Sequence, residues 1–252
     1  MPETTSQLEK RNLFRALLLS GSFVLVLWIV LGVEWAFGLD FGHFGILPRK
    51  LSGLLGVLTG PLVHGGLGHL ASNSGPLLVL FASILFFYRK VAFRAFSWIY
   101  IMTGLWVWVG ARTSYHIGAS GVVYGLAAFM FFSGVFRKDI RTLSLSLIVA
   151  FLYGGMVWGV LPQVEANISW ESHLYGALAG AAVAFALRKI GNRPKKRYSW
   201  ENEPEYEAKD DHAIWNYQES YFAPRPHPEE NEQLENQTII PKYHIPPSNP
   251  PD

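Results

Sequence analysis

The stretch 118-GASGVVYGLAAFMFFSGVFRK-138 decides how this chain can fold. It holds no charged residue before its last two, Arg137 and Lys138. A helix needs about 20 such residues to cross the hydrocarbon core of a membrane, which is roughly 30 Å thick. We therefore expect a transmembrane helix over 118–136, with Ser120 near one of its ends.

Five further apolar runs have the same character, and they cover residues 13–33, 67–88, 94–111, 142–162 and 171–188. Half of the 252 residues are apolar, while only 16% are charged, and many of those charges fall in the polar, Pro-rich segment 191–252. The remainder of the chain, residues 1–190, is too apolar for a water-soluble domain. The sequence predicts an all-α, polytopic membrane protein with six transmembrane helices. It holds no cysteine, which excludes disulfides and thiolate chemistry.

Lysine and arginine gather on alternate connections between these runs. The basic clusters are Lys10, Arg11 and Arg15; Arg89, Lys90 and Arg94; Arg137, Lys138 and Arg141; and the residues from Arg188 to Arg197. The other connections hold only Arg49, Lys50 and Arg112. Because cytoplasmic loops carry the excess of Lys and Arg, the pattern places both termini in the cytoplasm. We expect a multi-pass protein of a bacterial inner (plasma) membrane.

The chain divides into three parts. Residues 1–12 are expected to form a cytoplasmic N-terminus, 13–190 a six-helix domain, and 191–252 a cytoplasmic, disordered tail that lacks apolar periodicity. The connection 34–66 is too interrupted by Gly and Pro to span a membrane, yet too apolar to lie free in water. It is predicted to be an amphipathic surface segment that lies partly in the outer interface, beside the bundle.

Polar side chains inside a span are costly, so each is a candidate functional residue. The candidates are His69 and Asn73 in the second span, Ser120 in the fourth and His173 in the sixth. Counting about 1.5 Å per residue from the basic residues at the inner boundary puts Asn73, Ser120 and His173 at one depth, roughly 22–25 Å above it. His69 lies about one turn higher. The shared depth indicates a single site just below the outer surface.

The residue types at this depth suggest acyl transfer. A serine hydroxyl becomes a good nucleophile when a base removes its proton, and histidine is the commonest base. We predict a dyad of Ser120 and His173. No carboxylate is placed to be a third member, since Glu171 should point to a different side of its helix from His173. Tyr124, one turn from Ser120, is expected to orient the imidazole.

Acyl transfer also needs hydrogen-bond donors for the developing oxyanion. His69 and Asn73 are four residues apart, so one helix face presents both, and backbone N–H groups at the start of the fourth span are further donors. Gly118 and Gly121 keep this turn open for the substrate. His64 is expected to make a structural hydrogen bond that ties the preceding loop. The pair His69 and Asn73 would also suit a metal or ion site.

Small residues have a packing role in membrane helices. Gly176 and Gly180 in the sixth span form a G-x-x-x-G face that begins three residues after His173. If this face packs against the fourth span, it brings His173 toward Ser120. Each polar residue taken alone also has a structural explanation, in packing or in an isolated hydrogen bond.

Three stretches resemble the rhomboid family of intramembrane serine proteases: GASGVVYG at 118–125, HGGLGHLASN at 64–73 and HLYGALAG at 173–180. The resemblance covers roughly residues 10–190. It implies that Ser120 is the nucleophile and His173 the general base, that His69 and Asn73 stabilise the oxyanion, and that His64 is structural. It implies no cofactor and no metal.

The resemblance also implies a cavity open to the outer side, closed by a mobile loop over 162–171, with the fifth span as a lateral gate. Substrates would be other membrane proteins, cut near the outer ends of their helices, and no nucleic acid is implied. Some relatives carry an adjacent Trp-Arg pair in the first long loop; this chain does not, which leaves the anchoring of 34–66 open. The oligomeric state also stays open.

Two alternatives to a protease remain at this point. One is a non-proteolytic membrane chaperone built on the same fold. The other is a small transporter with a polar site formed by His69, Asn73 and His173.

Overall fold

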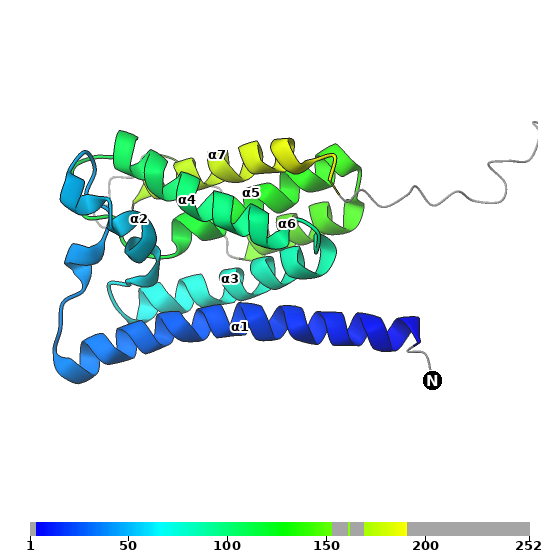
Figure 1. The fold of residues 1–252 in the computed structure, drawn as a ribbon, viewed down its shortest axis with the longest axis horizontal. Helices are drawn as coiled ribbons and strands as arrows, with labels where there is room; N and C mark the ends of the chain where they lie inside the picture. The colour runs from blue at the N-terminus through cyan, green and yellow to red at the C-terminus, as the bar shows by residue number, and fades with distance from the viewer. Residues whose placement is uncertain (1–3, 153–160, 162–168, 191–252) are drawn as a thin grey trace, which may run out of the picture. The chain divides into compact units, whose positions relative to one another are not determined.

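The computed structural model describes residues 4–152, 161 and 169–190. The regular secondary structure of these residues is helical, apart from one isolated antiparallel bridge between Ile46 and His116. The α-helices are α1 (Thr5–Phe37), α2 (Gly56–Thr59), α3 (Leu67–Phe87), α4 (Ala92–Gly110), α5 (Ser120–Arg137), α6 (Ile140–Leu152) and α7 (Trp170–Leu187) (Figure 1). The predicted all-α class is confirmed.

The predicted spans match the helices closely where the structure describes them. The bounds of α3, α4, α5 and α7 differ from the predicted ranges by three residues or fewer at each end. Four helices, α1, α3, α4 and α5, are long and apolar enough to cross a membrane. The predicted fifth span coincides with α6 up to Leu152, and its remainder lies mostly outside the described residues, as do most of the predicted 162–171 loop and the tail 191–252.

Helix α1 is longer than its apolar run. It begins at Thr5, so most of the predicted N-terminal segment 1–12 is helical. The Thr4 hydroxyl accepts the Gln7 N–H while the Gln7 side chain accepts the Thr4 N–H, a capping box that satisfies donors at the helix start. The helix ends at Gly38, whose φ of +61° suits glycine. Hydropathy alone missed this polar first part, because capping and not apolarity sets where a helix begins.

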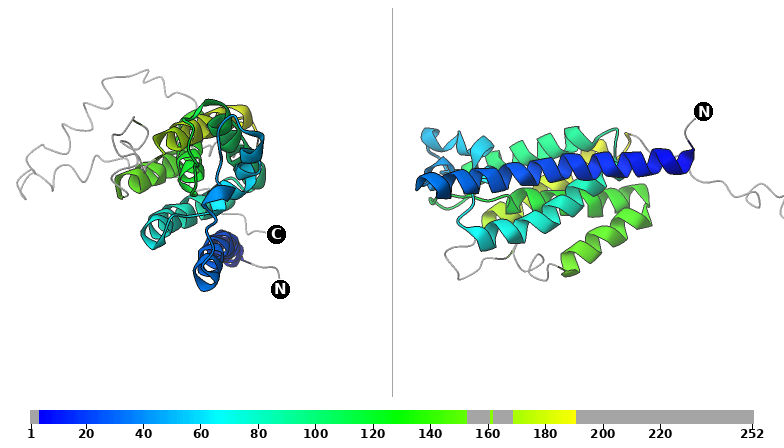
Figure 2. Two further views of the ribbon diagram at one scale, coloured as in Figure 1. Left: turned by 90° about the vertical axis from the view of Figure 1, so that its left-hand side faces the viewer. Right: turned by 90° about the horizontal axis from the view of Figure 1, so that it is seen from below.

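The helices pack around α5 and α7. Helix α7 lies against α5 and α4, while α1 lies at the edge of the bundle against α3 (Figures 1 and 2). A Cβ atom at Gly176 would overlap the carbonyl oxygen of Gly121, and one at Gly180 would overlap that of Gly125. Only glycine permits so close a contact. The G-x-x-x-G face thus packs against α5, the helix that begins with Ser120.

The 34–66 connection contains α2 and three 3₁₀ turns: η1 (Gly42–Phe44), η2 (Leu51–Gly53) and η3 (Gly60–Leu62). It does not lie on the surface throughout, because Ile46 and Val57 are about 95% buried. A Cβ at Gly104 of α4 would come within 3.2 Å of the Val57 backbone. Glycine at position 104 therefore lets this loop press its backbone against the bundle, and its place in the outer interface stays a prediction.

Arg49 anchors this loop to the end of α4. Its guanidinium donates to the carbonyl of Ala111 at 2.7 Å and to the hydroxyl of Thr113 at 2.7 Å. The Arg49 N–H donates to the Trp108 carbonyl at 2.9 Å, and the Trp108 indole N–H donates to the Lys50 carbonyl at 2.8 Å. A cation at a helix C-terminus is favourable. This tryptophan and arginine, distant in sequence, anchor the loop without an adjacent Trp-Arg pair.

Candidate active site

Ser120 is the first residue of α5, and the turn before it is held from two sides. The Gly118 N–H donates to the carbonyl of Gly60 at 2.9 Å, and the Ala119 N–H donates to Nε2 of His64 at 3.2 Å. Gly118 has a φ of +104°, a backbone angle that residues other than glycine rarely adopt. These contacts fix where the Ser120 side chain leaves the backbone.

His173 lies in the first turn of α7, where the glycine contact brings α7 against α5. Its Nε2 lies 2.9 Å from the Oγ of Ser120, and both side chains are partly exposed. The structure thus brings the predicted nucleophile and base within hydrogen-bond distance. A proton could pass from the hydroxyl to the imidazole without rearrangement.

Tyr124 lies on the face of the imidazole. The ring centroids of Tyr124 and His173 are 4.2 Å apart, and the two planes are inclined by only 9°. A stacked ring restricts the rotation of His173 and so keeps Nε2 directed at Ser120. Tyr124 is therefore in the position that one helical turn from Ser120 suggested.

His69 and Asn73 face the turn before Ser120. A Cβ built at Gly118 would come within 2.5 Å of the His69 ring and 3.7 Å of the Asn73 Nδ2. Gly118 therefore leaves space that any side chain would fill. Asn73 is buried, and its Nδ2 has no hydrogen-bond partner among the described residues. A buried donor is usually paired, so this one is available to an incoming acceptor.

His64 supports the turn before Ser120 through its two ring nitrogens. Its Nδ1 lies 3.3 Å from the carbonyl of Leu62, which can only accept, so Nδ1 carries the hydrogen and Nε2 is free to accept from Ala119. Burial, aided by the charge of nearby His69, lowers the pKa of His64 to about 4. The ring is neutral at physiological pH. The structural hydrogen bond expected of His64 is present.

Glu171 does not serve His173. Its carboxylate lies 3.5 Å from the Nε of Arg112, and Glu171 is 5% exposed. The sequence analysis excluded Glu171 from the dyad but gave it no partner. It also gave no role to His116 or Ser169, whose side chains lie 2.6 Å apart. A signal for His116 was present, since it lies only four residues before Ser120.

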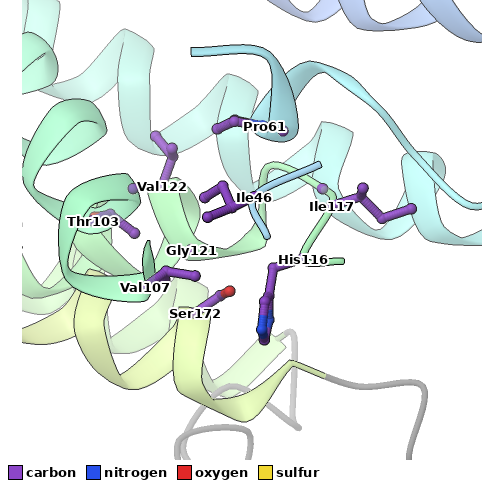
Figure 3. Close-up of a pocket in the computed structure, with 12 residues that line it drawn as sticks. Ile46, Pro61, Thr103, Val107, His116, Ile117, Gly121, Val122 and Ser172 are labelled. Atoms are coloured by element: carbon purple, nitrogen blue, oxygen red, sulfur yellow. The ribbon is translucent and has the colours of Figure 1, made fainter. Parts of the chain in front are cut away.

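A small cavity lies beside the start of α5 (Figure 3). Its volume is about 20 Å³, enough for about one water molecule and too small for a substrate side chain. Ile46, Thr103, His116, Gly121 and Ser172 are among the residues that line it.

Within the described residues, no group of three or more His, Cys, Asp or Glu side chains could hold a metal ion. The His69 ring lies beside that of His64, with the two ring centroids 5.1 Å apart, and His69 and Asn73 both face Gly118. Their arrangement around Gly118 suits donation to an oxygen atom.

Comparison with known proteins agrees with this geometry. The family model described as the Rhomboid domain matches residues 52–190, more than half of the chain. The chain is 35% identical over 178 residues to the uncharacterized protein Rv1337 of Mycobacterium tuberculosis, covering 66% of this chain and 72% of that one. It is 28% identical over 179 residues to the putative rhomboid protease YdcA of Bacillus subtilis, covering 65% and 86%. No solved structure matched. The chain belongs to the rhomboid family.

Proposed function

We propose that this protein is an intramembrane serine endopeptidase that cleaves transmembrane helices of other membrane proteins near the outer side of the membrane. The observation that carries the proposal is the 2.9 Å separation between the Ser120 Oγ and the His173 Nε2. A transporter site needs no serine held against a base, and a chaperone does not need one either. Family membership supports the same reaction class.

In the proposed reaction, the Ser120 Oγ attacks the scissile carbonyl carbon as His173 Nε2 takes the hydroxyl proton. The negative charge that develops on the carbonyl oxygen is stabilised by His69, by the Asn73 Nδ2 and by the Ser120 N–H, which its own helix leaves without an acceptor. The C–N bond then breaks, and the imidazolium gives its proton to the leaving amine.

Water completes the cycle. It attacks the acyl-enzyme ester at the carbonyl carbon, and His173 takes the water proton and returns it to the Ser120 Oγ as the ester bond breaks. The products are two peptides with a new carboxylate and a new amine. Neutral His64 and stacked Tyr124 hold the reacting groups in place throughout.

The substrate class follows from the setting of the site. We propose six spans with both termini in the cytoplasm, which puts Ser120 close to the outer surface. A peptide bond in a regular helix is shielded by its own hydrogen bonds. The preferred substrates are therefore helices with small or helix-breaking residues near their outer ends.

The test is labelling by a fluorophosphonate probe, alongside cleavage of a single-span reporter protein. The wild type should form a covalent adduct on Ser120 and release reporter fragments. Ser120→Ala and His173→Ala should do neither, while reaching the membrane in normal amount. A client-holding activity that survives in Ser120→Ala, together with no labelling of the wild type, would instead favour the chaperone alternative.

A further inference from the structure

The start of α7 is held by a chain of side-chain hydrogen bonds that begins in the connection between α4 and α5. His116 Nδ1 lies 2.6 Å from the Ser169 Oγ, which lies 2.7 Å from the Ser172 Oγ. The Ser169 Oγ also accepts the Ser172 N–H at 3.3 Å, which caps α7. The N-cap of the helix that carries His173 is thus fastened to the connection that leads into Ser120.

The donor directions in this chain can be assigned. His116 Nε2 lies 3.0 Å from the carbonyl of Arg112, which can only accept, so the hydrogen is on Nε2. Nδ1 is then an acceptor and receives the Ser169 O–H. Burial lowers the pKa of His116, although the Arg112 carbonyl and the Glu171 charge act in the other direction, and this favours the neutral ring. A neutral imidazole is what this arrangement requires.

His116 is itself fixed by its backbone. Its N–H and C=O pair with the C=O and N–H of Ile46, both at 2.9 Å, and its side chain is almost fully buried. A second tie runs parallel to the first, since Arg112 forms an ion pair with Glu171 in the first turn of α7. The connection therefore contacts α7 through a rigid ring and an ion pair.

Ser169 is the residue through which this support reaches His173. The Ser169 carbonyl lies 3.4 Å from the His173 N–H and 3.1 Å from that of Ser172. A shift of Ser169 would therefore move the backbone of His173 relative to Ser120. A misplacement of about 1 Å between reacting groups can cost about a hundredfold in rate.

We propose that His116, acting through Ser169, is a positioning residue that sets the alignment of His173 with Ser120. The inference rests on the proposed function, because the alignment matters only if these two residues react. The hydrogen bonds that the structure gives to the His116 side chain go to Arg112, Ser114 and Ser169. His116 acts by fixing the position of the first turn of α7.

The experiment compares His116→Phe, His116→Asn and Ser169→Ala. Phenylalanine keeps a ring but cannot accept the Ser169 O–H. Asparagine has an acceptor, Oδ1, at the same distance from its Cα in bonds as the Nδ1 of histidine. We expect kcat for reporter cleavage to fall at least about tenfold in His116→Phe and Ser169→Ala, with KM within about twofold. His116→Asn should retain most of the wild-type kcat. The matched control is Ser22→Ala, which changes a serine in α1 that is far in sequence from Ser169.

The double variant His116→Phe/Ser169→Ala gives the sharpest result. If both substitutions break the same bond, the double variant should be no slower than the more affected single variant. Fluorophosphonate labelling rates should follow the same order. If His116→Phe fails to fold, Ser169→Ala, which removes a single oxygen, carries the test.

The inference is overturned if His116→Phe and Ser169→Ala react like the wild type, or if His116→Asn is as slow as His116→Phe. Either result would leave the proposed function standing, because wild-type labelling at Ser120 tests that independently. A wild type that is never labelled would instead refute the proposed function itself.

Discussion

At the residue scale, the site depends on one hydroxyl and one imidazole whose positions are both set by neighbours. Ser120 is placed by the bond from Ala119 to His64 and by the conformation of Gly118. The His173 ring is placed by the Tyr124 ring stacked upon it. Because each reacting group is held by separate contacts, single substitutions should separate chemistry from stability.

Asn73 offers the cleanest separation. We expect Asn73→Leu, which removes the amide but keeps the volume, to lower kcat about a hundredfold by removing an oxyanion donor, with little change in KM. The thermal stability should stay level or rise, because the buried Nδ2 has no partner to lose among the residues that the structure describes. Reporter cleavage kinetics and thermal unfolding in detergent check both parts. A stability loss that matches the activity loss would show that Asn73 is structural.

His64 should make stability depend on pH. Its pKa is about 4 in the folded protein, against an ordinary value of 6.5 when unfolded, so acid favours the unfolded state. Its contribution is fully present above pH 6.5, falls as the pH drops toward 4, and amounts to about 3 kcal/mol once lost. In His64→Gln, whose amide oxygen can still accept the Ala119 N–H, thermal unfolding between pH 7 and 4 should vary less. Some variation should remain, because the pKa of His116 is lowered as well. An unchanged pH profile in the variant would contradict this assignment.

At the element scale, the contact between α5 and α7 decides whether the site exists. The carbonyl oxygens of Gly121 and Gly125 occupy the space that side chains at Gly176 and Gly180 would need. The same small faces let two polar residues, Ser120 and His173, approach each other from different helices. The contact that packs α5 against α7 is therefore also the contact that brings the two reacting residues together.

Gly176→Ala should therefore reduce both stability and activity. The methyl group would overlap backbone and not a flexible side chain, so the helices must separate, at a cost of about 1–3 kcal/mol. Gly32→Ala in α1 is the matched control, because nothing lies within 4 Å of its added Cβ. The control should be neutral or slightly stabilising, since alanine favours helix. Thermal unfolding and probe labelling of the two variants measure the difference, and equal behaviour would contradict the close contact.

At the scale of the whole described bundle, a group of polar contacts lies at each end of the helices that carry the candidate site. Helices α3, α5 and α7 each begin near the site, so the positive ends of their dipoles converge where an oxyanion would form. At the opposite end, the Arg137 guanidinium donates to the carbonyls of Leu187 at 2.7 Å and Ile190 at 2.9 Å. Arg137, the last residue of α5, therefore also caps α7.

The chain contains no cysteine, so its membrane topology can be mapped with single introduced thiols. Asp40 and Lys90 are both exposed. Asp40 follows α1 and Lys90 follows α3, and because these two helices run in opposite directions, the two residues lie at opposite ends of the pair (Figure 1). With both termini in the cytoplasm, Asp40→Cys should react with a membrane-impermeant maleimide in intact cells. Lys90→Cys should react only after permeabilisation. The reverse pattern would invert the proposed orientation, and with it the side of the membrane on which cleavage occurs.

The sequence by itself determined the helical class and the bounds of most helices, and it predicted which residues form the candidate site. It could do so because apolar length, polar residues within spans and glycine spacing are local properties of the chain. The polar start of α1 was missed because a capping box, and not hydropathy, sets it.

Only the tertiary structure decided how the site is supported. Arg49 and Trp108, His116 and Ser169, and Arg112 and Glu171 are pairs separated by some 50 to 60 residues, and nothing in the local sequence indicates that they meet. The same holds for the contact between Ser120 and His173, whose shared depth could be estimated but whose distance could not. Depth is a property of one helix, whereas distance depends on how two helices pack.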